Sequence, residues 1–207
     1  MVSISKGLAI AVCFLLATFC CLAQKQEHKR WANVRIKESG FVLGAGYGID
    51  TFNLPQGNYT PLFCIARLGI DFRNKNAKTD GRRGEYSIFF EPQINPVFLR
   101  KTNSSKVEWE YGLNIGFQHC YPISKDLYSA IFIATGPHYF SAVTERQAPG
   151  FIFSDNFGAG FYYFLYKDWA INAGFRLRHM SNAQTRLPNS GINTFNFMIG
   201  VSKMLRK

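Results

Sequence analysis

Three polar side chains near the C-terminus have the types needed for acyl-transfer chemistry. His179 and Ser181 stand two residues apart, and Asn193 follows further along the chain. A histidine can take the proton of a serine hydroxyl, and the activated oxygen can then attack an ester carbonyl. A third group that accepts a hydrogen bond from the imidazole holds the ring in the required tautomer. These residue types therefore suit nucleophilic hydrolysis of an acyl group.

Two strands joined by a loop are predicted to position these residues. Residues 169–181 and 193–205 each alternate apolar and polar side chains, which is the period of a β-strand. The cluster Pro188-Asn189-Ser190-Gly191 between them is typical of the loop of a hairpin. The strand ends that meet at this loop should therefore lie side by side.

The parity of the two strands places all three residues on an apolar face. His179 and Ser181 share a face with Leu177 and Phe175, and Asn193 shares one with apolar residues of its own strand. In a soluble protein this face would be the core. In a barrel set in lipid it would be the outer wall, and the opposite, polar face would line the lumen.

The rest of the chain favours the barrel. Six earlier segments are predicted to be strands: residues 40–51, 60–72, 85–99, 107–120, 127–140 and 151–165. The register of 127–140 is unclear, because residues 130–134 are apolar on both parities. Eight such segments predict an all-β fold, an eight-stranded antiparallel transmembrane β-barrel. Pro92 and Pro96 predict a bulge or an irregular region in the third strand, because each removes a ladder donor.

Charged residues on the inward parity are predicted to fill the lumen. A narrow barrel must pack its interior with side chains, and an unpaired charge there is costly. We therefore expect ion pairs between inward acids and inward bases. These residues are Glu91, Glu108, Glu110, Arg67, Arg176 and Arg178.

The N-terminus predicts export from the cytoplasm. Residues 1–23 combine Lys6, an apolar run and a Cys-Leu-Ala cleavage site, which is typical of a cleaved signal peptide. Residues 24–39 are predicted to form a polar N-terminal arm, and residues 40–207 the barrel. No later segment has the ~18 consecutive apolar residues of a transmembrane helix.

The composition limits the kinds of binding partner and cofactor that are expected. The net charge is +11, but a secreted barrel is not expected to meet nucleic acid. No metal cluster, phosphate-binding glycine loop or nucleotide motif is found, so no metal or other cofactor is expected. Cys64 and Cys120 remain after the signal is lost. A disulfide between them stays open, although two small apolar residues on separate strands are favoured.

A family resemblance makes the prediction more specific. The run His179-x-Ser181-Asn182-Ala, followed by Pro-Asn189-x-Gly191, resembles the active-site hairpin of the outer-membrane lipid A 3-O-deacylases. The resemblance implies a serine esterase site on the outer wall of a barrel in the bacterial outer membrane. It implies that the enzyme removes an ester-linked acyl chain from lipid A of lipopolysaccharide. It also implies His179 as base, Ser181 as nucleophile, and Asn182 and Asn189 in an oxyanion hole.

The third triad position departs from the family, which has a glutamate where this chain has Asn193. The amide oxygen of Asn193 can orient the imidazole but supplies no charge. Asp155 is a second candidate for the orienting acid. If residues 166–168 form a three-residue turn, Leu165 pairs with Trp169, and the same register places Asp155 opposite His179.

Two other functions stay open at this stage. The chain could be a non-catalytic structural barrel, or an esterase or phospholipase acting on another membrane lipid. Dependence of activity on Ser181 separates an enzyme from an inert barrel.

With both termini in the periplasm, the seventh strand ends at the cell surface, where lipopolysaccharide lies. Loop cations at Lys106, Arg146 and Arg186 suit either lipid A phosphates or general solubility. The sequence leaves the choice between monomer and homodimer open.

Overall fold

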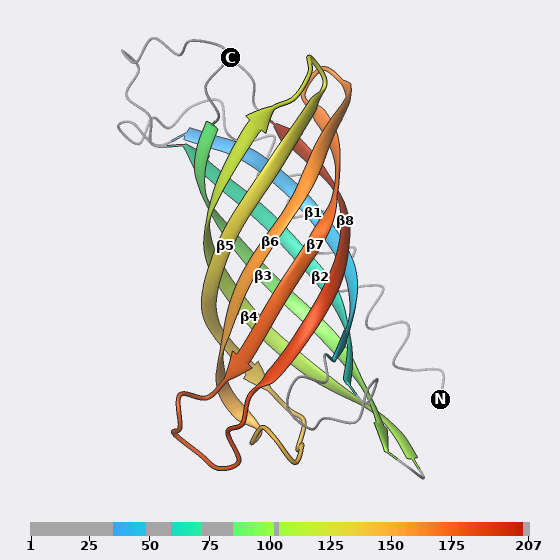
Figure 1. Cartoon of the computed structure of the whole chain (residues 1–207), viewed down its shortest axis with the longest axis vertical. Coiled ribbons are helices and arrows are strands. Elements are labelled where there is room, and N and C mark those ends of the chain that lie inside the picture. The colour runs from blue at the N-terminus through green and yellow to red at the C-terminus, as the bar shows by residue number, and fades with distance from the viewer. Residues whose placement is uncertain (1–34, 49–58, 72–84, 102–103, 205–207) are drawn as a thin grey trace. The chain divides into compact units, whose positions relative to one another are not determined.

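Eight antiparallel strands close into one barrel in the computed structural model, which describes residues 35–48, 59–71, 85–101 and 104–204. The strands are β1 (Arg35–Gly48), β2 (Tyr59–Asp71), β3 (Glu85–Lys101), β4 (Ser104–Pro122), β5 (Leu127–Phe140), β6 (Gly150–Tyr166), β7 (Trp169–Ser181) and β8 (Ile192–Met204). Each strand pairs with its neighbours in the chain, and β1 pairs with β8 (Figure 1). The predicted eight-stranded all-β fold is confirmed, whereas the predicted signal peptide lies outside the described residues.

The first strand begins earlier than the sequence pattern suggested. Strand β1 starts at Arg35, so residues 35–39 of the predicted polar arm belong to the barrel wall. The reason is visible at Glu38, which is 2% exposed and accepts hydrogen bonds from Tyr162 and Ser202 in the lumen. The charge of Glu38 suggested a solvated arm, but this side chain points into the lumen. The other seven strands differ from the predicted segments by at most three residues at either end.

The two prolines of β3 interrupt one ladder without a bulge. Strand β3 pairs with β4 in one continuous register through Pro92 and Pro96, and with β2 in the same register on both sides of them. The β2 ladder lacks pairs opposite the prolines, and the side-chain oxygen of Asn95 accepts the backbone N–H of Cys64 at 3.4 Å. Of the two predicted alternatives, a bulge or an irregular region, the structure shows the second, as a gap in the β2–β3 ladder.

Outward side chains form an apolar wall. On β5, whose register the sequence left unclear, Ile131 and Ile133 are exposed while Ala130 and Ala134 are buried in the lumen. Strand β4 shows the same alternation over residues 107–122. Such an exterior is costly in water and suits a hydrocarbon environment. No helix among the described residues is long and apolar enough to cross a bilayer.

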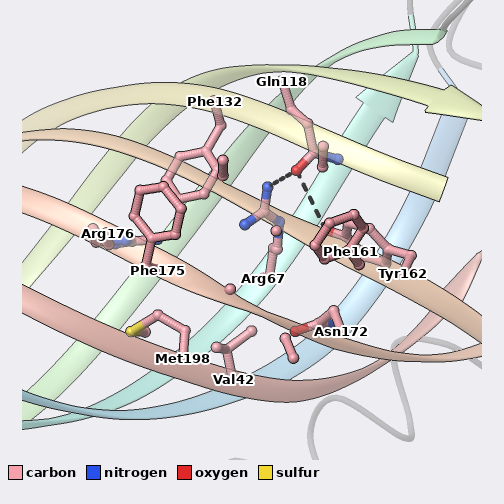
Figure 2. Close-up of a pocket in the computed structure, with 15 residues that line it drawn as sticks. Val42, Arg67, Gln118, Phe132, Phe161, Tyr162, Asn172, Phe175, Arg176 and Met198 are labelled. Atoms are coloured by element: carbon pink, nitrogen blue, oxygen red, sulfur yellow. Dashed lines mark hydrogen bonds between the residues drawn. The ribbon is translucent and has the colours of Figure 1, made fainter.

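Ion pairs fill the middle of the lumen, as predicted. Glu91 is fully buried, and it accepts hydrogen bonds from Arg67 at 2.8 Å and from Arg176 at 2.8 and 3.0 Å. Beside them lies a small cavity, where Arg67 also reaches Gln118 (Figure 2). Each arginine also lies over an aromatic ring, Arg67 at 3.9 Å from the Phe89 centroid. The buried charges are therefore paired rather than isolated.

A second polar group lies nearer the end at which the odd-numbered strands finish, here called the distal end. The buried carboxylate of Glu110 bonds to Arg178 and to Nδ1 of His138. It also accepts longer hydrogen bonds, at 3.3 Å, from Asn95 and Tyr59. His138 thus belongs to the lumen network. Glu108 pairs instead with Lys106 and accepts a hydrogen bond from Ser141 at 2.6 Å.

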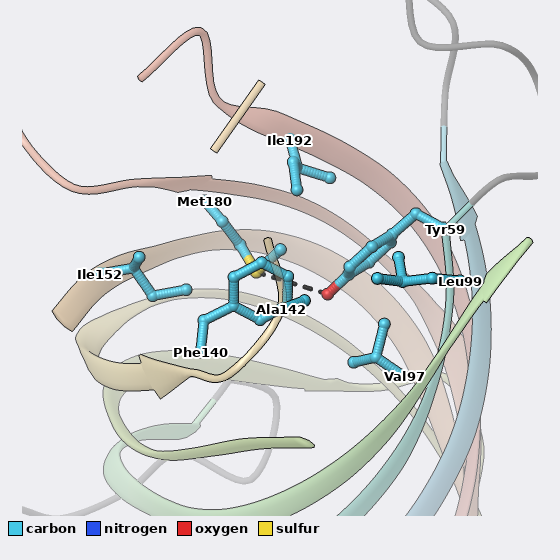
Figure 3. Packing of buried hydrophobic residues seen from close by; sticks show 8 residues of the cluster. All are labelled: Tyr59, Val97, Leu99, Phe140, Ala142, Ile152, Met180 and Ile192. Atoms are coloured by element: carbon cyan, nitrogen blue, oxygen red, sulfur yellow. Dashed lines mark hydrogen bonds between the residues drawn. The ribbon is translucent and has the colours of Figure 1, made fainter. Parts of the chain in front are cut away.

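An apolar cluster closes the distal end of the lumen. Figure 3 shows its members packed together: Tyr59, Val97, Leu99, Phe140, Ala142, Ile152, Met180 and Ile192. Met180 lies between His179 and Ser181 in sequence, and its buried side chain faces Tyr59 with a sulfur–hydroxyl contact of 3.7 Å. The end of β7 is therefore fixed from inside.

Cys64 and Cys120 are free cysteines on β2 and β4, so they form no disulfide.

Removing the charge of Glu91 should destabilise the barrel strongly. Glu91→Gln leaves Arg67 and Arg176 buried without their shared anion, which typically costs about 3–5 kcal/mol of unfolding free energy. Urea unfolding of the protein reconstituted in lipid vesicles measures this loss. Glu145→Gln removes an exposed loop carboxylate and is the matched control. Equal stability of the two variants would contradict the role assigned to the lumen pairs.

Candidate functional site

A row of polar side chains crosses the apolar outer wall near the distal end. Thr135 of β5 pairs with Asp155 of β6, Asp155 pairs with His179 of β7, and His179 pairs with Asn193 of β8. Ser181 follows on the same face of β7. Among the strand residues that the structure describes, Asp155 is the only carboxylate on an outward position. The structure therefore brings the predicted residues together and adds Thr135 to them.

The imidazole of His179 is oriented by Asn193. The Nδ1 atom of His179 lies 2.7 Å from Oδ1 of Asn193. Because an amide oxygen can only accept, Nδ1 carries the proton, and Nε2 keeps its lone pair. A histidine in this tautomer can act as a base toward a hydroxyl group. Ser181, half-buried and two residues along the same face, is the nearest hydroxyl in the sequence of β7.

Asp155 flanks His179 from the other side. Its carboxylate accepts a hydrogen bond from Oγ1 of Thr135 at 2.6 Å. Asp155 is directly opposite His179 in the β6–β7 ladder, where the Cβ atoms of paired residues are about 4.5–5.5 Å apart. His179 thus lies between a neutral amide on β8 and a carboxylate on β6.

The register that places Asp155 was predicted correctly from a turn that was predicted wrongly. Tyr166 pairs with Trp169, so the turn has two residues, Lys167 and Asp168, rather than three. A register shift between Phe164 and Tyr166 then restores the predicted pairing of Asp155 with His179. Lys167 has a positive φ of 44°, as tight turns of this length require.

Gly191 forms one wall of the imidazole site. Its φ is +72°, and a Cβ atom at this position would lie 2.5 Å from Cε1 and 3.2 Å from Nε2 of His179. Both the backbone conformation and the close approach make a larger residue costly at this position. The glycine of the hairpin motif is therefore a contact of the candidate base.

The two motif asparagines shape the loop after Ser181. The backbone N–H of Asn182 donates to Oδ1 of Asn189 at 2.9 Å, and the buried side chain of Asn182 donates to the carbonyl of Arg186 at 2.6 Å. Thr185 donates to the Asn182 carbonyl from both its N–H and its hydroxyl. The side-chain oxygen of Asn189 thus accepts the hydrogen bond from Asn182. The side-chain nitrogen of Asn189, Nδ2, is a donor that can point elsewhere. Both asparagines lie in the loop that borders Ser181.

Fold and site together define a class of protein, a β-barrel with a lipid-facing polar site at one end of its outer wall. Residues 119–202 match the family model described as lipid A 3-O-deacylase (PagL). This range contains the whole polar row together with Ser181. The match supports the resemblance drawn from the hairpin motif, and it covers less than half of the 207-residue chain.

Solved structures show the same fold. The crystal structure of the outer membrane enzyme PagL superposes with a TM-score of 0.52 and 17% identity, over 79% of this chain and 97% of that chain. Neisserial surface protein A superposes with a TM-score of 0.52 and 9% identity, over 84% of this chain and 98% of that chain. At these identities the likeness concerns the barrel fold. No curated protein sequence matches the chain.

Thr135 is the site residue that sequence reasoning missed. It is a polar residue on the outward parity of β5, a strand whose apolar run on both faces hid that parity. A search for polar residues on outward positions, once the barrel register is known, would have found it. Its hydrogen bond to Asp155 could not be predicted without the pairing of β5 with β6.

Substituting Gly191 should disturb His179, while substituting Gly150 should not. Both glycines have positive φ, so Gly191→Ala and Gly150→Ala should each lose about 1 kcal/mol or more of stability. Only a Cβ at Gly191 meets the imidazole, because the atom nearest to a Cβ at Gly150 is Arg186 Nη1 at 3.6 Å. NMR of imidazole-labelled protein should show the His179 signals shifted in the first variant alone. Unchanged His179 signals in Gly191→Ala would refute the contact.

Proposed function

We propose that this protein hydrolyses an ester bond that links an acyl chain to lipid A. The observation that carries the proposal is the His179–Asn193 hydrogen bond of 2.7 Å on the lipid-facing wall, which leaves Nε2 of His179 available as a base. The family-model match over residues 119–202 supports lipid A as the substrate class. The oriented base, the nucleophile and the apolar surroundings suit an ester at a membrane surface.

The proposed reaction has two halves. In the first, Oγ of Ser181 attacks the ester carbonyl while Nε2 of His179 takes the hydroxyl proton. The tetrahedral intermediate collapses, the bond to the sugar oxygen breaks, and His179 returns the proton to that oxygen. In the second, His179 takes a proton from water, which attacks the acyl-serine and releases the free fatty acid. Ser181 recovers its proton, so the enzyme is regenerated.

The negative charge on the carbonyl oxygen needs donors, and the loop after Ser181 supplies candidates. Asn182 and Asn189 are proposed to form or shape the oxyanion hole. The Nδ2 group of Asn189 is the more direct donor, because its Oδ1 is held by the N–H of Asn182. One such donor typically contributes a factor of about 10² to 10³ in kcat. Asn182 contributes by fixing the loop through Arg186 and Thr185.

The site's place on the barrel determines how the substrate reaches it. With the termini in the periplasm, the distal end lies at the cell surface, and the polar row faces the outer leaflet. Phe153 and Phe157 flank Asp155 on the outward face of β6, and Leu177 precedes His179 on that of β7. These side chains give acyl chains an apolar surface beside the catalytic groups. The enzyme can therefore attack the ester without extracting lipid A from the membrane.

Asp155 is proposed to supply the charge that Asn193 lacks. During the reaction the imidazole becomes positively charged, and a nearby carboxylate stabilises that state. Asn193 orients the ring, while Asp155, held by Thr135, faces it from β6. In this arrangement the two duties of the usual acidic residue are divided between neighbouring strands.

A specific observation favours one rival. Because Asn193 is neutral, the barrel could have kept its fold and lost catalysis, which would make it a structural protein. An esterase or phospholipase acting on another membrane lipid would use the same groups. The experiments that follow separate these functions.

Lipid A from cells that express the protein should lose one ester-linked acyl chain. Ser181→Ala should abolish the loss, since removal of a triad member typically lowers kcat by about 10⁴-fold or more. Mass spectrometry of extracted lipid A and phospholipids measures both substrates. Ser129→Ala removes a hydroxyl from β5 far from the row and is the matched control. Unchanged lipid A with cleaved phospholipid would favour the other esterase, and no change in either lipid the inert barrel.

Charge at the two flanking positions should control the rate. Asp155→Asn keeps the size of the side chain and should lower kcat by about tenfold or more, since a unit charge within about 10 Å contributes at least ~1.4 kcal/mol in a partly shielded site. Thr135→Val should have a smaller effect. Asn193→Glu, placed in the Asp155→Asn background, should restore activity by returning the charge from β8. Full activity of Asp155→Asn would rule out this role for the carboxylate.

A further inference from the structure

The loop between β5 and β6 folds onto the loop that carries the hairpin motif. The backbone N–H of Ser190 donates to the carbonyl of Arg146 at 2.7 Å, and the N–H of Ala148 donates to that of Pro188 at 2.8 Å. Gln147 and Asn189 form an antiparallel bridge between these two hydrogen bonds. Figure 1 shows the two loops side by side at the lower end of the barrel. They form a short ribbon, and Gln147 and Ala148 are buried in it.

The side chain of Arg146 binds the same loop a second time. Its Nε donates to the carbonyl of Gly191 and its Nη2 to the carbonyl of Ser190, both at 3.0 Å. The planar guanidinium can reach two successive carbonyls with two of its donors, whereas a lysine ammonium has no such fork. Arg146 is therefore engaged by the loop backbone rather than directed only at solvent.

One of the two residues that Arg146 holds, Gly191, is a contact of the candidate base His179. Gly191 lies against the imidazole of His179, with room for no Cβ atom between them. Gly191 is followed in the chain by the buried Ile192 and then by Asn193, which accepts the hydrogen bond from His179. A shift of the Gly191 carbonyl would therefore move both the wall of the imidazole site and the residue that orients the ring.

We propose that Arg146 is a positioning residue, which fixes Gly191 and thereby the His179–Asn193 pair. The proposal rests on the proposed esterase function and assigns a role to a residue of a different loop. It also separates Arg146 from the other loop cations. Arg186 is exposed and makes one longer hydrogen bond, from Nη1 to the carbonyl of Pro149 at 3.3 Å, away from Gly191.

The alternative for a basic residue beside this site is contact with a phosphate of lipid A. The two roles respond differently to lysine. A phosphate contact depends mainly on positive charge, which lysine retains, and its loss raises KM. A positioning contact depends on the two-carbonyl geometry, which lysine cannot reproduce, and its loss lowers kcat because small displacements of a catalytic group reduce the rate by up to about 10²-fold.

The experiment compares Arg146→Lys and Arg146→Gln with Arg186→Lys and Arg186→Gln in full-length protein folded in detergent micelles. Deacylation of purified lipid A gives kcat and KM, and NMR of labelled histidine reports the His179 ring. We expect both Arg146 variants to lower kcat by about 10- to 100-fold with KM within about twofold, and to shift the His179 signals. The Arg186 variants should leave the His179 signals unchanged, because that side chain contacts the carbonyl of Pro149 and not Gly191.

Two results would overturn the proposal. If Arg146→Lys keeps kcat while Arg146→Gln mainly raises KM, Arg146 acts as a charge toward the substrate. If neither variant moves the His179 signals, the loop contact does not position the ring. The NMR arm does not depend on turnover, so failure of the wild-type protein to deacylate lipid A would reject the proposed function separately from the positioning role.

Discussion

Closure of the sheet decides which side chains meet lipid and which meet the lumen. In a closed barrel each strand must alternate between the two environments along its whole length, because no edge or open face remains. Lipid makes an outward charge costly, so a carboxylate and an imidazole on that wall need a functional reason. Asp155 and His179, with Thr135, Asn193 and Ser181 beside them, interrupt an exterior that is mostly aliphatic and aromatic. The alternation of side chains that the closed barrel requires therefore makes the polar site recognisable on the outer wall.

Strand β7 joins the two environments. Its inward residues Arg176 and Arg178 are held by Glu91 and Glu110, and Met180 packs in the apolar cluster of the distal end. The outward residues between and after them include His179 and Ser181. The lumen charges have no part in the proposed chemistry, yet they fix the strand that carries it. Preorganisation of the site thus depends on packing inside the barrel, as catalysis by a fixed base requires.

Alternation of side chains was enough to predict the eight strands and the residues that pair in the lumen. It failed at Glu38, whose charge suggested a solvated arm. Contacts with Tyr162 and Ser202, which are distant in sequence, place Glu38 in the lumen instead. The hairpin motif predicted His179, Ser181 and Asn193, all of which depend on one local element. Thr135 and Arg146 escaped prediction because their roles arise from strand pairing and loop contacts between separate hairpins. The pairing of Asp155 with His179 was predicted only because a bulge compensated for a shorter turn.

The most direct test of the account asks whether Ser181 is an activated nucleophile. A fluorophosphonate probe should attach covalently to the folded protein, and peptide mass spectrometry should locate the adduct at Ser181. The account predicts that labelling disappears in His179→Ala, because the hydroxyl then has no base. An absence of labelling in the folded wild-type barrel, or labelling that persists without His179, would contradict the claim that the lipid-facing polar row is an esterase site.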